Sequence, residues 1–131
     1  MPKTLQLTVT LPGSPDELFD AYTDQKLHGA WVGSPMFVAT SPGGEFRAFN
    51  DQVSGRILHT APKRMIVQTW RSMGWKPGDG DSVLIITLTA VGSETQLDLV
   101  QVGIPDDDFD NVEKGWESYY WKPWRERRAA A

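Results

Sequence analysis

The sequence predicts an α+β fold in which an antiparallel sheet of about seven strands curves around one long C-terminal helix. Two observations lead to this prediction. Before residue 103, the chain consists mainly of short segments in which apolar residues alternate with polar ones or follow one another directly. These segments end at Gly, Pro, Asn or Asp, which is typical of strands. The chain after it is an acidic run followed by a helix with large rings on one face. A helix of this kind needs a broad apolar surface, which the sheet would supply.

The first segment alternates Leu5, Leu7, Val9 and Leu11 with threonine and glutamine, which predicts a half-buried strand. Ser14 begins a short helix, because Pro15 suits the first helical position and Glu17 completes a capping box. Asp24 is expected to cap a second short helix containing Leu27, Ala30 and Trp31.

Six further strands are predicted at 36–39, 45–49, 53–60, 64–71, 82–90 and 94–102, separated by turns at 41–44, 50–51, 61–63 and 91–93. Strand periodicity places alternate residues on the face that meets the helix. The expected inward residues are Ile66, Gln68, Trp70, Leu84, Ile86, Leu88, Leu97, Leu99 and Gln101.

On a helix of about 100° per residue, one face spans an arc of roughly 100° and carries mostly rings. Its members are Phe109, Val112, Trp116, Tyr119, Tyr120 and Pro123. Pro123 has no backbone N–H, so the helix is expected to kink or stop near Lys122.

Composition favours a single domain over residues 1–131 with ordinary apolar (40%) and charged (23%) fractions. A net charge of −4 gives no field that attracts nucleic acid. The chain has no cysteine, no membrane span and no signal-peptide pattern at its start, so we expect a cytoplasmic protein.

No catalytic residue, metal site or cofactor motif stands out. His28 and His59 are isolated, and packing or surface roles are favoured over a base or zinc ligand. The acidic run at 106–110 does not have the spacing of a calcium loop. The glycines at 43–44 have no phosphate-loop lysine, and no serine lies in a nucleophile elbow.

Several stretches in a fixed order resemble one family. They are Gln68-Thr69-Trp70-Arg71, Trp75-Lys76-Pro77-Gly78-Asp79, residues 82–88, Glu94-Thr95-Gln96-Leu97, Gly103-Ile104-Pro105 and residues 115–123. The chain resembles the C-terminal domain of the activators of the ninety-kilodalton heat-shock chaperone's ATPase, most closely over residues 64–124. The resemblance implies a helix-grip fold of the START and pollen-allergen type. Eukaryotic activators carry a separate N-terminal domain that does much of the stimulation, and this sequence shows none, so co-chaperone activity does not follow from the resemblance.

The first functional hypothesis is a non-enzymatic protein that binds a small hydrophobic or amphipathic molecule between sheet and helix. The proposed walls are Trp70, Leu97, Leu99, Trp116, Tyr119 and Tyr120, with Gln68 and Gln101 as polar anchors. The alternative is a solid core in which the two amides bond to each other, to a tyrosine or to a trapped water.

Two other functions remain open. One is a stress-response interaction module that binds a heat-shock chaperone ATPase. The other is an enzyme resembling aromatic polyketide cyclases, which would need a titratable group in its pocket, drawn from tyrosines, amides, Arg47 or Arg56. A homodimer is compatible with each of these functions.

The Gly- and Asp-rich loop 72–81 would act as a lid, or Trp75 would anchor it to the sheet edge, and anchoring is favoured.

Overall fold

The computed structural model describes residues 2–39, 41 and 43–130, and within them one antiparallel sheet has seven strands in the order β1-β7-β6-β5-β4-β3-β2. The strands are β1 (Lys3–Pro12), β2 (Phe37–Val38), β3 (Glu45–Ala48), β4 (Val53–Ala61), β5 (Met65–Ser72), β6 (Ser82–Val91) and β7 (Glu94–Ile104). The predicted α+β architecture is confirmed. Of the predicted turn at 41–44, Pro42 lies outside the described residues.

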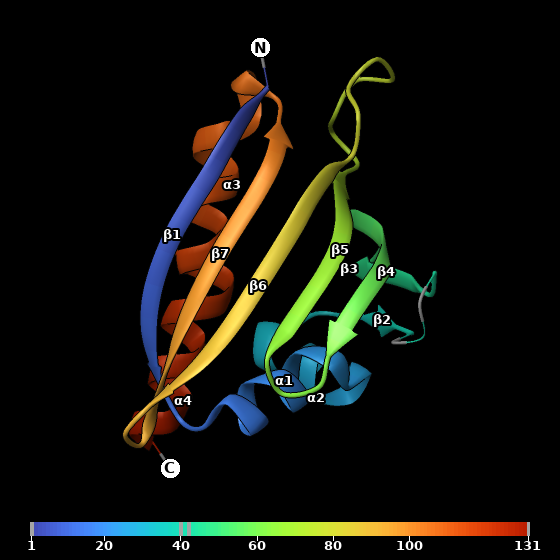
Figure 1. The fold of residues 1–131 in the computed structure, drawn as a ribbon. Helices are drawn as coiled ribbons and strands as arrows, with labels where there is room; N and C mark the ends of the chain where they lie inside the picture. The colour runs from blue at the N-terminus through green and yellow to red at the C-terminus, as the bar shows by residue number, and fades with distance from the viewer. Residues whose placement is uncertain (1, 40, 42, 131) are drawn as a thin grey trace.

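The C-terminal segment runs alongside the sheet as one long helical rod (Figure 1). It consists of a short 3₁₀ turn η1 (Asp106–Asp108), α3 (Phe109–Trp116), a π-helical turn η2 (Glu117–Trp121) and α4 (Lys122–Ala130). No helix within the described residues is long and apolar enough to cross a membrane.

The two predicted short helices follow β1 as α1 (Pro15–Thr23) and α2 (Gln25–Val32). Ser14 caps α1 through the predicted capping box with Glu17. Asp24 caps α2, because its carboxylate accepts from the backbone N–H groups of Lys26 and Leu27. Contacts of α1 with β6, and of α2 with η2 and α4, close one end of the molecule.

The predicted inward faces of β5, β6 and β7 are correct. Leu84, Ile86, Leu88, Leu97 and Leu99 are buried. Leu84 is paired with Gln68 on one side and with Gln101 on the other. The two amides are therefore two strand spacings apart, about 10 Å, and do not bond to each other.

The π turn changes which helix residues face the sheet. The backbone N–H of Lys122 bonds the carbonyl of Glu117, five residues earlier. One additional residue in a turn rotates everything after it by about 100° relative to a regular α-helix. Trp121 and Trp124 are buried as a result, whereas Tyr119 is 54% exposed. The prediction that Tyr119 lies on the buried face is wrong for this reason.

The same turn explains how the helix passes Pro123. Proline cannot donate to the carbonyl four residues before it, and its ring crowds that carbonyl. The irregularity expected here takes the form of η2, directly before Pro123, and α4 then continues to Ala130. Trp124 is secured beyond it, since its Nε1–H donates to the carbonyl of Pro12 at 2.6 Å.

Side chains fill the space under the rod where it faces Ile86, Leu88 and Leu97. A void of only about 10 Å³ remains there, beside Trp116, Tyr120 and Trp121. Such a void holds one water molecule at most. The core is therefore solid where Leu97 meets Trp116 and Tyr120, and the larger hollow lies elsewhere.

Candidate functional site

A groove of about 540 Å³, open to solvent, lies along the rod where it faces the β3–β4 turn and the end of β5. This volume is within the usual range for small-molecule sites. We call it the aromatic groove; its lining residues are Phe49, Gln52, Val53, Trp70, Ser72, Asp108, Asn111, Val112, Lys114, Gly115, Trp116, Ser118, Tyr119 and Tyr120.

The rings of the aromatic groove come from three separate elements. Phe49 belongs to the β3–β4 turn, and its ring centroid lies 5.2 Å from that of Tyr119 and 6.2 Å from that of Tyr120. Trp70 comes from β5, while Trp116 lies 4.7 Å from Tyr120 on the rod. These separations are in the range in which aromatic rings attract each other edge-on or offset.

The turn that carries Phe49 has an unusual backbone. Phe49, Asn50 and Asp51 are all left-handed, with φ of 53°, 57° and 69°. Asn and Asp tolerate this conformation, but a phenylalanine there costs on the order of 1 kcal/mol or more. The turn is held by hydrogen bonds from Asn50 N to the Pro35 carbonyl and from Met73 N to the Gln52 carbonyl. Strain of this kind at the rim of a groove is typical of functional sites.

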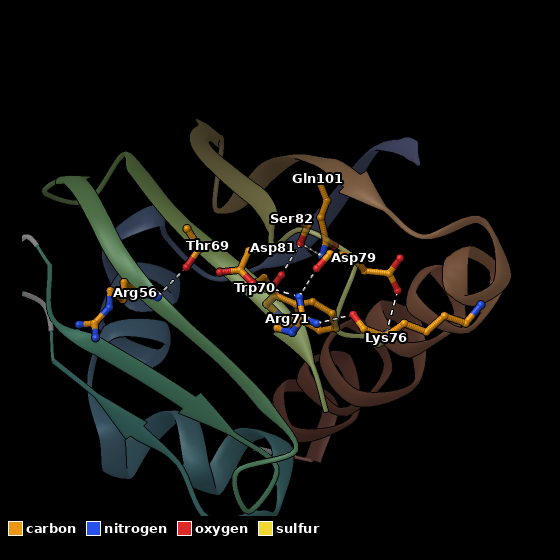
Figure 2. A network of polar contacts seen from close by, with 9 residues as sticks. All are labelled: Arg56, Thr69, Trp70, Arg71, Lys76, Asp79, Asp81, Ser82 and Gln101. Atoms are coloured by element: carbon orange, nitrogen blue, oxygen red, sulfur yellow. Dashed lines mark hydrogen bonds and ion pairs between the residues drawn. The ribbon is translucent and has the colours of Figure 1, made fainter. Parts of the chain in front are cut away.

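A chain of hydrogen bonds connects the two walls of the groove. Trp116 Nε1 donates to Gln101 Oε1 at 3.0 Å, and Gln101 Nε2 donates to Ser82 Oγ at 3.1 Å. The Ser82 hydroxyl in turn donates to the Trp70 carbonyl at 2.7 Å (Figure 2). Gln101 and Ser82 are fully buried. This chain fixes the Trp116 side chain relative to the β5 backbone at Trp70.

The loop after β5 is anchored at the end of the groove. Arg71 donates from Nη1 to the Asp79 carbonyl at 2.5 Å and from Nη2 to the Lys76 carbonyl at 2.6 Å (Figure 2). Trp75 is buried, lies against Trp70 and donates to Asp108 Oδ2 at 2.7 Å. It does not line the groove. Trp75 therefore anchors the loop to the sheet, which is the role that the sequence favoured over that of a lid.

Behind the groove, a buried network joins α1 and α2 to the rod. His28 Nδ1 lies 2.8 Å from the Tyr22 carbonyl, and His28 Nε2 lies 2.8 Å from the Tyr120 hydroxyl. A carbonyl only accepts, so Nδ1 carries the proton and Tyr120 donates to Nε2. The Tyr22 hydroxyl donates to Gln68 Oε1, and Gln68 Nε2 donates to the Thr69 carbonyl.

Burial shifts the pKa values of this network. It lowers the pKa of the His28 imidazole from 6.5 to about 4, because the charged form would lose its hydration. It raises the pKa of the Tyr22 and Tyr120 phenols above their usual range for the same reason. All three side chains are therefore neutral at pH 7. His28 is a packing residue, one of the two roles favoured for it.

Four of the eight predicted site residues line the groove, namely Trp70, Trp116, Tyr119 and Tyr120. The other four, Gln68, Leu97, Leu99 and Gln101, are buried in the core and do not line it. Every buried side-chain nitrogen and oxygen among the described residues has a hydrogen-bond partner. The two amides thus bond to the protein itself, to Tyr22 and Thr69 and to Ser82 and Trp116.

Sequence reasoning missed several lining residues. The sequence predicts a strand over 45–49 that ends at Phe49, and the Asn50-Asp51 pair after it is the signal that a turn redirects its ring. Lys114 lies in no motif, and Gly115 begins a stretch that resembles the family without a site role, although a glycine inside a helix is a recognisable anomaly. Arg47 and Arg56 do not line the groove; Arg47 pairs with Glu45, and Arg56 donates to the Gly43 carbonyl.

The curved sheet, the long rod beside it and the two short helices after β1 define a helix-grip protein. Among solved structures, an HSP90 activator from Plasmodium falciparum has the same fold, with a TM-score of 0.82, 23% identity and coverage of 89% of each chain. The Aha1 dimer from Colwellia psychrerythraea has a TM-score of 0.74 at 15% identity, covering 89% of this chain and 90% of that chain.

Residues 12–122 match the family described as Activator of Hsp90 ATPase homolog 1-like protein, and the chain belongs to this family. It is 32% identical over 120 residues to Activator of 90 kDa heat shock protein ATPase homolog 1 from Homo sapiens. That alignment covers 90% of this chain and 35% of the human protein. The chain therefore spans about a third of the length of the curated relatives it matches.

Proposed function

We propose that this chain is a non-enzymatic binding protein that holds a small hydrophobic or amphipathic molecule in the aromatic groove. The observation that carries the proposal is an open hollow of about 540 Å³ with five rings in its lining. Tyr119 contributes one of them although it is 54% exposed. Phe49, Trp70 and Tyr119 are at least partly accessible around a concave surface, which favours binding of an apolar partner.

The position of the site differs from the hypothesis drawn from the sequence. The ligand would lie beside the rod, against Phe49 and Trp70, and not beneath it against Leu97 and Leu99. The wall opposite the rod is rigidly supported, since the Gln101–Ser82 chain and the Trp75 anchor both act on the β5 end. A site held in this way needs little reorganisation to bind, which favours affinity.

The test is a fluorescence titration with the neutral aromatic probe N-phenylnaphthylamine. Tyr119→Ala is expected to weaken binding about tenfold. The contact between the Tyr119 ring and the probe, together with the area that it buries, contributes about 1.4 kcal/mol to the binding free energy. Leu58→Ala is the matched control, since Leu58 is 46% exposed and does not line the groove. Failure of the wild type to bind the probe, or equal loss in both variants, would refute the groove as a site. Native mass spectrometry of protein purified from its own host would identify a retained ligand.

A second candidate function is a chaperone interaction module, favoured by the similarity to the human activator over 120 residues. The outer face of the central strands also offers a surface, where Val67, Ile85 and Val100 form one partly exposed row and Val102 is 46% exposed. We expect calorimetric binding to the host's Hsp90-type ATPase and a change in its ATPase rate, both reduced by Val102→Lys and unaffected by Tyr119→Ala. An absence of both heat and rate change would exclude this function.

A further inference from the structure

Resting on the proposed function, we infer that the molecule held in the aromatic groove is a flat aromatic compound with an anionic group. Its ring system lies on the bare helix surface at Gly115, and its anionic group pairs with Lys114. Both residues are on α3 and both line the groove.

Gly115 is the first observation. A glycine inside a helix is less stable than alanine there, because it has more backbone freedom to lose on folding. No crowding requires a glycine at this position: a Cβ added to Gly115 would meet only Tyr119 Cδ2, at an ordinary contact distance of 3.8 Å. The absent side chain instead leaves the helix backbone uncovered in the lining of the groove, where a ligand can approach it closely.

This glycine differs from others in the chain for which the structure supplies a local reason. Gly55 lies against the neighbouring strand, where a Cβ would come within 1.9 Å of the Thr69 carbonyl oxygen. Gly33 ends α2 in the left-handed conformation, with φ of 68°. Neither reason applies to Gly115. We therefore attribute the presence of this glycine, which costs helix stability, to the shape of the groove.

The rings around Gly115 favour a planar ligand. Trp116 and Tyr119 follow it on the rod, and Phe49 and Trp70 stand on other elements. Flat rings gain from stacked and edge-on contacts with such walls beyond the area they bury, whereas an aliphatic chain gains only the burial.

Lys114 supplies the preference for an anion. The charged side chains in the lining are Asp108 and Lys114. Asp108 already accepts from Trp75 Nε1 and from Asn111 Nδ2, one bond at each oxygen. The Lys114 side chain has no hydrogen bond or ion pair with any part of the chain that the structure describes. A carboxylate, sulfonate or phosphate on the ligand would be its partner.

Two probes with the same skeleton test the anion. Anilinonaphthalene sulfonate is N-phenylnaphthylamine with a sulfonate added. The wild type is expected to bind the sulfonate more tightly than the neutral probe, and Lys114→Gln should weaken only the sulfonate, by about fivefold. Lys122→Gln is the control, because Lys122 is exposed on the same rod and does not line the groove. Equal effects of Lys114→Gln on both probes would overturn the pairing.

Substitution of Gly115 tests the floor of the groove. Gly115→Ala and Gly115→Leu should raise the urea midpoint, since both residues are better helix formers. The same variants should weaken both probes, the leucine by more than about tenfold because it occupies the ligand's place. Glu113→Leu adds a leucine to α3 off the groove and is expected to leave binding unchanged. A near-ultraviolet circular dichroism spectrum like that of the wild type excludes probe binding to loosened protein.

The outcomes separate the two proposals. If the wild type binds neither probe, the proposed function fails. If the wild type binds N-phenylnaphthylamine through Tyr119 but Gly115→Leu binds equally well, the groove stands as a site and the placement of the ligand on Gly115 is wrong.

Discussion

Trp116→Ala is expected to lower the free energy of unfolding by about 3–5 kcal/mol, close to the largest effect of any single truncation in a small core. Trp116 is 3% exposed and contacts both Tyr120 and Trp121, with ring centroids 4.7 and 5.6 Å away. Its loss also leaves Gln101 Oε1 without its donor inside the core. An unsatisfied buried acceptor adds about 1–3 kcal/mol to the cost.

The measurement is urea unfolding followed by far-ultraviolet circular dichroism, with Tyr119→Ala as the matched control. Tyr119 is three residues away on the same rod, yet it is 54% exposed, so its truncation should cost no more than about 1 kcal/mol. Trp116→Phe keeps a ring, removes the bond to Gln101 and should fall between the two. If Trp116→Ala and Tyr119→Ala lowered the free energy of unfolding equally, the π turn would not rotate the helix as described.

The second large effect is a loss of stability in mild acid that depends on His28. Its pKa is about 4 in the folded protein and 6.5 in the absence of burial, so between these values the unfolded chain binds a proton that the folded protein does not. Stability therefore rises with pH in this window and falls as the pH is lowered. From pH 7.5 to 4.5 the loss from this group is about 2–3 kcal/mol.

The folded protein resists protonation because burial removes the hydration of the charged ring, and the hydrogen bond to the Tyr22 carbonyl offsets only part of that loss. The groups that contact the imidazole are the rings of Tyr22, Trp31, Phe46 and Tyr120, together with the Tyr22 carbonyl. Protonation at Nε2 would also remove the acceptor of the Tyr120 hydroxyl. We expect urea unfolding of His28→Gln to depend much less on pH between 7.5 and 5, where carboxylates contribute little.

His59→Gln, a change at an exposed histidine, should retain the pH dependence of the wild type. The wild type provides an independent readout, because the NMR signals of the His28 ring should shift with a midpoint near pH 4. A midpoint near 6.5, or an unaltered pH dependence in His28→Gln, would contradict the buried neutral imidazole.

The two buried amides show which structural features a sequence pattern can predict and which it cannot. Period-two alternation identified Gln68 and Gln101 as inward residues on strands, which is correct because a strand's side chains alternate whatever it pairs with. Their partners depend on register and on elements far away in the chain. Tyr22 lies 46 residues from Gln68, and Trp116 lies 15 residues from Gln101. No local pattern carries that information.

The helix shows the same division. Ring spacing correctly indicated a long helix with Trp116 and Tyr120 toward the sheet, and Pro123 correctly indicated an irregularity. The form of the irregularity was not predictable, because a kink, an end and a π turn all relieve the missing N–H. The π turn that forms leaves Tyr119 exposed and Trp121 and Trp124 buried. It also leaves the rings of Tyr119 and Tyr120 in the lining of the aromatic groove.

By itself, the sequence determined the order and type of the elements, the inward faces of the central strands and the family, because these follow from periodicity, capping and local motifs. The tertiary structure alone decided that the space under the rod is filled and that the hollow lies beside it. Packing of side chains from β3, β5 and the rod sets where volume remains, and it depends on the left-handed turn at Phe49 and on the π turn before Pro123.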